Sequence, residues 1–124
     1  MRYAPDSGVR ISLELLYGDS SLITNDRVAL AAHMMKSAGN GEAFIEHLER
    51  FTLPDPTPDL AKITAPTLIM WGRADGFIPP THGRMMQDAI PNAQFALNDG
   101  VGHIPQEEAP ARTAADAQRF LKME

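Results

Sequence analysis

Apolar residues recur at the spacing of α-helices through residues 1–53. A patch of leucines precedes a turn at residues 18–21, and Thr24 then offers an N-cap for a helix. That helix carries Val28 and Ala32 on one stripe. The pattern predicts an amphipathic helix that packs against a neighbouring element.

A second helix is predicted after the glycines at positions 39 and 41, which stop the first one. Phe44, Leu48 and Phe51 lie along one face of this second helix. Two short amphipathic helices separated by a glycine-rich turn indicate a helical hairpin. Plain packing is the role expected for most of their apolar side chains.

Residues 54–65 form a predicted linker, because proline occupies every second position at its start. Such a run cannot continue a helix and makes a poor inner strand, so it behaves as a stiff, extended connector. A single helical turn at residues 59–63 is expected to lead from the linker into the next section.

Residues 66–124 alternate between strand and helix patterns. The first run is apolar on both faces, as expected for a strand that helices cover on two sides. The expected elements are strands at residues 67–71 and 93–97 and helices at residues 82–90 and 110–121. This order predicts a parallel pair of strands joined by a right-handed helical crossover. The predicted fold class is α/β, with two N-terminal helices followed by a parallel β-α-β-α unit.

The composition fits one small globular domain, with 44% hydrophobic and 22% charged residues among 124. The formal net charge is -5 and the basic residues are scattered singly, which argues against nucleic acid or an anionic membrane as the main partner. A small-molecule substrate is the expected ligand. No apolar run approaches a membrane span, and the first eight residues lack the apolar region of a signal peptide, so we expect a cytoplasmic protein.

Cysteine is absent, which excludes disulfides, thiolate metal sites and a cysteine nucleophile. His33, His47 and His82 have no metal-ligand spacing with each other or with nearby carboxylates. We interpret these histidines as surface or packing residues. The sequence therefore predicts neither a bound metal nor a cofactor.

An acid and a base stand where the two predicted strands end: Asp75 follows the first strand and His103 the second. Because the carboxyl ends of parallel strands meet at one edge of a sheet, Asp75 can accept a hydrogen bond from His103. That bond would fix the imidazole tautomer and stabilise the imidazolium, so the two residues are two-thirds of a nucleophilic triad. A turn-stabilising role is the alternative for Asp75, and Asp99 is a second candidate for the acid.

Two aromatic and two acidic residues lie near these strand ends. Trp71 and Phe77 are candidates for contact with a substrate, and core packing is the alternative interpretation of Trp71. Glu107 and Glu108 are interpreted as the start of the last helix, where they favour the positive end of its dipole. The two glutamates are therefore given a structural role.

The motifs PTLIMWGRADGFIP at residues 66–79 and GHIPQEEAP at residues 102–110 resemble the C-terminal half of an α/β-hydrolase. The helical section before them resembles the end of that family's cap. Three stretches are similar to the meta-cleavage-product hydrolases, which cleave carbon–carbon bonds, and to related esterases: Trp71-Gly72-Arg73, Phe77-Ile78-Pro79 and His82-Gly83. By position in the motifs, the resemblance implies that Asp75 is the triad acid and His103 the triad base.

The nucleophile elbow of that family, Gly-x-Ser-x-Gly, does not occur in this sequence, and neither does the His-Gly oxyanion loop that normally follows an early strand of the family fold. Both belong to the N-terminal half of the family fold, which this chain is expected to lack. Ser7, Ser20 and Ser21 remain as candidates for the nucleophile, although each stands in a turn-like sequence.

A two-stranded sheet has two exposed edges and too little core to be stable alone. The chain is therefore expected to form a homo-oligomer or to complement a separate N-terminal half; a gene remnant that folds only partly is a third interpretation. The predicted function is hydrolysis of a carboxylic ester or a related acyl or C–C substrate by the Asp75–His103 pair within such an assembly. The alternative is a non-catalytic, truncated hydrolase half that serves as an interaction and oligomerisation module.

Overall fold

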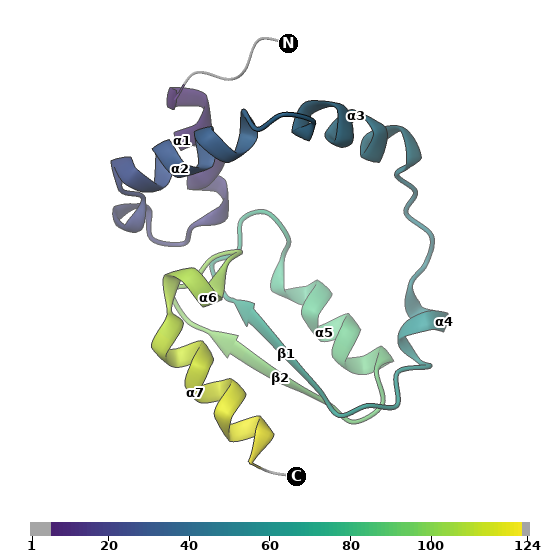
Figure 1. The fold of residues 1–124 in the computed structure, drawn as a ribbon. Helices are drawn as coiled ribbons and strands as arrows, with labels where there is room; N and C mark the ends of the chain where they lie inside the picture. The colour runs from purple at the N-terminus through teal and green to yellow at the C-terminus, as the bar shows by residue number, and fades with distance from the viewer. Residues whose placement is uncertain (1–5, 123–124) are drawn as a thin grey trace.

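The computed structural model describes residues 6–122, and within this range a pair of strands lies between helices on both faces (Figure 1). The first two helices lie beyond the carboxyl ends of the strands (Figure 1). The elements in chain order are α1 (Asp6–Leu16), the 3-10 helix η1 (Ser20–Leu22), α2 (Asn25–Met35), α3 (Asn40–Arg50), α4 (Thr57–Leu60), β1 (Thr67–Gly72), α5 (Pro80–Ala89), β2 (Ala93–Asn98), α6 (Pro105–Glu108) and α7 (Pro110–Leu121).

The strands β1 and β2 are parallel, with a register that runs from Thr67 opposite Ala93 to Gly72 opposite Asn98. Helix α5 connects them and packs on one face of the sheet, while α7 lies on the other face (Figure 1). The predicted parallel pair, its helical crossover and the α/β fold class are confirmed. This topology brings the loops that follow β1 and β2 to the same edge of the sheet.

A buried apolar cluster holds the N-terminal helices together, and Ile104 from the loop after β2 packs against it. Thr24 caps α2 as predicted, because its hydroxyl accepts the backbone N–H of Arg27 at 3.2 Å. The buried members of the cluster are Val9, Tyr17, Ile23, Val28 and Ala32. The cluster therefore joins α1 and α2 to the end of the sheet that carries His103.

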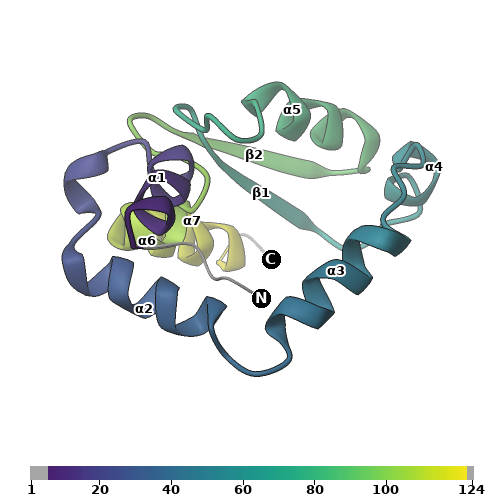
Figure 2. The ribbon, with the colours of Figure 1, turned by 90° about the horizontal axis from the view of Figure 1, so that it is seen from above.

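The predicted hairpin between the helix at residues 25–35 and the helix after it is wrong. Helix α2 packs on α1, which the sequence pattern did not separate as a helix of its own, so residues 6–53 hold three α-helices and the 3-10 helix η1. The stripe of α2 with Val28 and Ala32 is covered by α1 and is not available to α3. Helix α3 lies apart from the sheet in Figure 1, and in the view of Figure 2 it extends toward the amino-terminal end of β1; Phe44 is 61% and Leu48 52% exposed.

The connector between the helical section and the sheet is extended apart from α4, a single helical turn that begins at Thr57, two residues earlier than predicted. Leu53 at its start is 85% exposed. No side chain among the described residues is less than 2% exposed, so the core is shallow. Among residues 6–122, no helix has the length and apolar character needed to cross a membrane.

Candidate active site

The loops after β1 and β2 are joined by backbone hydrogen bonds. The N–H of Arg73 donates to the carbonyl of Asn98, and the N–H of Ala74 donates to the carbonyl of Val101, both at 2.9 Å. These bonds continue the parallel pairing beyond the last residue of each strand. They hold the segment that carries Asp75 beside the segment that leads to His103.

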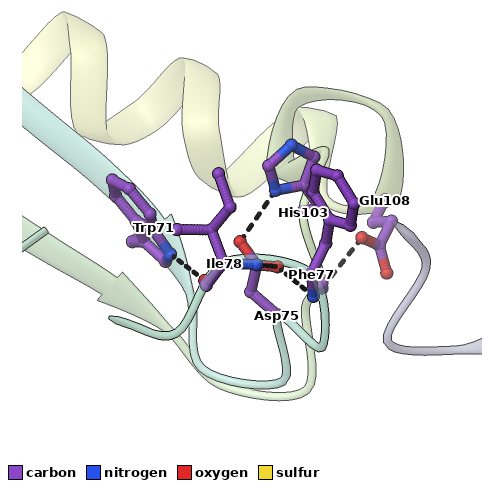
Figure 3. A network of polar contacts seen from close by, with 7 residues as sticks. Trp71, Asp75, Phe77, Ile78, His103 and Glu108 are labelled. Atoms are coloured by element: carbon purple, nitrogen blue, oxygen red, sulfur yellow. Dashed lines mark hydrogen bonds and ion pairs between the residues drawn. The ribbon is translucent and has the colours of Figure 1, made fainter. Parts of the chain in front are cut away.

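The carboxylate of Asp75 faces the imidazole of His103, as Figure 3 shows. The distance from Asp75 Oδ2 to His103 Nδ1 is 2.9 Å. The other carboxylate oxygen, Oδ1, accepts the backbone N–H groups of Phe77 at 2.9 Å and Ile78 at 2.8 Å. Both oxygens are thus occupied, and the carboxylate is held in one orientation toward the ring.

The side chains of Asp75 and His103 differ in how far they are exposed to solvent. The Asp75 side chain is 2% exposed, whereas the His103 side chain is 29% exposed. With Nδ1 hydrogen-bonded to the carboxylate, Nε2 is the nitrogen of His103 on which a proton can be exchanged with a reacting group. The arrangement fits a buried acid that orients a base within reach of solvent or substrate.

Opposing effects act on the pKa of Asp75. Burial raises it, but hydrogen bonds from the Ile78 amide, the His103 ring and the Phe77 amide lower it, and together they bring the pKa below its ordinary value. The carboxylate is therefore ionised at neutral pH. An ionised Asp75 can stabilise the imidazolium that forms when His103 takes up a proton.

The lowered pKa predicts a loss of stability in acid. A carboxyl whose folded-state pKa lies below the unfolded value, near 3.8, contributes fully above that value and loses its contribution as the pH falls through the folded-state pKa. Urea unfolding at neutral pH and at about pH 3 should show a smaller pH-dependent loss in Asp75→Asn than in the wild type. Asp55→Asn is the comparison, because the pKa of Asp55 is also lowered, by hydrogen bonds from the side chain and the backbone N–H of Thr57, but Asp55 is exposed to solvent. Solvent screening should make its effect on the pH dependence smaller than that of the buried Asp75. Equal pH dependence in wild type and Asp75→Asn would contradict the prediction.

Three glycines allow the backbones around the site to approach closely. A Cβ on Gly72 would lie 2.0 Å from the carbonyl oxygen of Gly102, and a Cβ on Gly102 would lie 2.4 Å from the nitrogen of Gly18. Any side chain at Gly72 or Gly102 would therefore force the loops apart. The end of β1, the loop of His103 and the turn after α1 are stacked in direct backbone contact.

Two glutamates of α6 bind the turn after α1. Glu107 accepts the hydroxyl of Tyr17 at 2.8 Å and the guanidinium of Arg27 at 3.0 Å. Glu108 accepts the backbone N–H groups of Gly18 and Gly102, both at 2.8 Å. The interpretation of these residues as the start of the last helix is therefore wrong. Helix α7 begins only at Pro110, and the short α6 turns both carboxylates toward the N-terminal segment.

A small cavity of about 160 Å³ adjoins the acid–base pair. Trp71 lies beside it, half-buried, with its indole N–H donating to the carbonyl of Ile78 at 3.1 Å. The Phe77 ring meets the His103 ring edge-on, with 5.1 Å between the centroids, and Phe77 is 60% exposed. The residues that line the cavity are Met70, Trp71, Gly72, Asp75, His103 and Pro105. Both predicted substrate-contact residues thus lie next to the pair.

The candidate nucleophiles lie on the N-terminal helices. Ser7 is in the first turn of α1, and Ser20 and Ser21 begin η1. No hydrogen bond connects His103 to a serine within residues 6–122. The structure therefore brings the acid and the base together without bringing one of these hydroxyls to them.

The remaining candidates lie away from the pair. Asp99, the second candidate for the acid, is exposed and pairs with Arg73. The histidines at positions 33, 47 and 82 are exposed on helices. Across the residues that the structure describes, no three His, Cys, Asp or Glu side chains are grouped as metal ligands.

The chain is similar to proteins of a known family. A family model described as the alpha/beta hydrolase fold matches residues 17–110. Lipase 3 of Moraxella sp. is 39% identical over 61 residues, which cover 49% of this chain and 19% of the lipase. A 2-hydroxy-6-oxononadienedioate/2-hydroxy-6-oxononatrienedioate hydrolase of Cupriavidus pinatubonensis is 37% identical over 95 residues, which cover 73% of this chain and 32% of that hydrolase.

A solved structure gives the same result for the fold. The meta-cleavage product hydrolase of Pseudomonas fluorescens has a TM-score of 0.82 at 24% identity, and the match covers 98% of this chain and 47% of that one. The chain spans less than half the length of each of these three proteins. The resemblance inferred from the motifs is confirmed, and the chain belongs to the alpha/beta hydrolase fold family.

Proposed function

We propose that this chain supplies the acid–base half of a hydrolase site, in which Asp75 orients His103 and His103 transfers the proton. The observation that carries the proposal is the 2.9 Å contact between His103 Nδ1 and a carboxylate that is itself buried and held by two backbone amides. We further propose that residues 1–53 are cap-like, that residues 54–65 are a linker and that residues 66–124 are the core.

The proton transfer follows from this contact. Nε2 of His103 would take the proton from an attacking hydroxyl and return it to the leaving group, while Asp75 stabilises the intermediate imidazolium. Esters and C–C ring-fission products are the substrate classes proposed, because the matched relatives are named as a lipase and as a 2-hydroxy-6-oxononadienedioate/2-hydroxy-6-oxononatrienedioate hydrolase. Trp71, which lines the cavity, and Phe77, whose ring contacts His103, would provide apolar contact with such a substrate.

We propose that the nucleophile comes from outside the two loops, in a homo-oligomer or from a complementing N-terminal half. The support is the absence of a serine bonded to His103 within residues 6–122, together with apolar side chains that are not covered. Phe44 and Leu48 on α3 and Phe51 directly after it are each more than half exposed. An assembly would cover this face and complete the site.

A non-catalytic oligomerisation module is the second candidate, and the same exposed face of α3 favours it. The two candidates differ in whether His103 does chemistry. In the first, turnover depends on the imidazole; in the second, the imidazole only stabilises the loop. Association alone does not distinguish them, so the test must follow a reaction.

The experiment measures hydrolysis of a p-nitrophenyl ester by the 124-residue chain and labelling of the chain by a fluorophosphonate. We expect hydrolysis above the buffer rate, because His103 can activate water even where no serine is bound to it. A labelled serine, mapped by mass spectrometry, would identify the nucleophile, and sedimentation would give the oligomeric state of the active species. Hydrolysis at the buffer rate together with no labelling would contradict catalysis by the chain alone or as a homo-oligomer and favour the module.

A further inference from the structure

We propose that Glu108 is a positioning residue for His103, and this inference rests on the acid–base role proposed above. One carboxylate of α6 collects backbone N–H groups from two segments that are far apart in the sequence. Its Oε1 accepts from Gly102 at 2.8 Å, and its Oε2 accepts from Gly18 at 2.8 Å and from Asp19 at 3.4 Å. Gly102 is the residue directly before His103.

Two contacts tie the backbone around His103 to the end of α1 and the turn that follows it. The N–H of His103 donates to the carbonyl of Leu16 at 2.6 Å. The peptide before it is bound by Glu108, which also binds the turn that follows Leu16. Figure 3 shows the Glu108 carboxylate beside the loop from which the His103 ring reaches toward Asp75. The ring position thus depends on the end of α1 as well as on Asp75.

A carboxylate suits this position because it only accepts hydrogen bonds. Gly102 is buried, so its N–H would have no water to replace a lost acceptor. Glutamine at position 108 keeps the size of the side chain but has one acceptor oxygen, and its NH₂ group would face a backbone N–H. The substitution therefore breaks the bond to one of the two segments without creating a cavity.

The neighbouring Glu107 provides a matched control. It has the same charge and lies on the same helical turn, but its carboxylate binds the side chains of Tyr17 and Arg27 at the surface. Within residues 6–122, that carboxylate makes no bond to the backbone of the His103 loop. Glu107→Gln weakens the contact between α6 and the N-terminal segment, but it leaves the backbone N–H of Gly102 bound to Glu108.

Loosening the His103 loop would lengthen the Nδ1–Oδ2 contact. Catalysis is sensitive to displacements of about 1 Å in a reacting group, so a loop that moves on this scale would lower proton transfer while the fold persists. The expected consequence is visible without any turnover. It appears in the imidazole Nδ1–H proton signal and in hydrogen exchange of the loop amides.

The test is NMR spectroscopy of the whole chain in wild type, Glu108→Gln and Glu107→Gln. In Glu108→Gln we expect exchange of the Gly102 and His103 amides to accelerate about tenfold or more, with loss of the His103 Nδ1–H signal. In Glu107→Gln both should stay within about twofold of the wild type. Urea unfolding of each variant gives the free energy of unfolding. If Glu108 had a purely structural role, its substitution would lower this free energy without a selective effect on the His103 imidazole.

The outcomes separate the alternatives. If Glu108→Gln keeps the Nδ1–H signal and the amide protection, or if Glu107→Gln loses them equally, the proposal is overturned. Should Glu108→Gln not fold, Glu108→Ala removes the acceptor without adding a donor and is judged on the same signals; failure of both to fold also overturns it. If the signals respond as expected but ester hydrolysis does not depend on His103, the positioning role holds and the proposed function fails.

Discussion

His103→Ala is expected to reduce hydrolysis of a p-nitrophenyl ester about 10²- to 10⁴-fold, down to the buffer rate. The substitution removes the only imidazole that is hydrogen-bonded to a buried carboxylate among the described residues. Without it, the attacking hydroxyl or water keeps its proton and the leaving group receives none. The measurement is the initial rate over a range of ester concentrations, with kcat and KM determined separately.

His82→Ala is the matched control, because His82 is exposed on α5 and lies outside the cavity beside the pair. Its rate should remain within about twofold of the wild type, as expected for a surface substitution. Asp75→Asn offers a second comparison, since it preserves the shape of the side chain but no longer enforces the tautomer with Nδ1 protonated. Equal hydrolysis by wild type and His103→Ala would contradict the catalytic proposal.

Gly72→Ala is expected to destabilise the chain by about 3 kcal/mol or more, because overpacking where no flexible side chain can yield must move backbone. The added methyl would lie 2.0 Å from the Gly102 carbonyl oxygen and 2.2 Å from that of Val101. A chain with a stability of roughly 5–15 kcal/mol would lose a large share of it. Urea unfolding followed by circular dichroism measures the change.

The control for this substitution is Gly39→Ala, at the start of α3. Gly39 has a φ of +85°, but a Cβ there would meet nothing within 4 Å. We expect a cost of only about 1–2 kcal/mol, the penalty of a left-handed backbone for an L-residue. A Gly72→Ala variant as stable as Gly39→Ala would show that the loops of Asp75 and His103 can separate without loss, contrary to their close backbone stacking.

The contact between Asp75 and His103 was predictable because it depends on a short-range pattern and one general rule. Two apolar runs with a helix between them predict parallel strands, and the residues after such strands share one edge of the sheet. Asp75 and His103 stand directly in those positions. Their hydrogen bond in the structure agrees with that expectation.

The supports of the pair were not predictable in the same way. Glu108 binds Gly18, 90 positions away in the chain, and nothing in the neighbourhood of either residue indicates the other. The partner of α2 was predicted wrongly for a similar reason. An amphipathic stripe shows that a helix has a face to bury, but α1 and α3 both offered apolar residues to cover it.

Local patterns in the sequence were sufficient to place most of the helices, the two strands and the loops with Asp75 and His103, because apolar spacing, glycine and proline act over a few residues. Only the tertiary structure determined the 2.9 Å contact between Asp75 and His103, the burial of the Asp75 side chain and the bond from the His103 loop to Glu108. These features depend on which distant backbones approach one another. That choice follows from the packing free energy of the whole chain and is not encoded in any short segment.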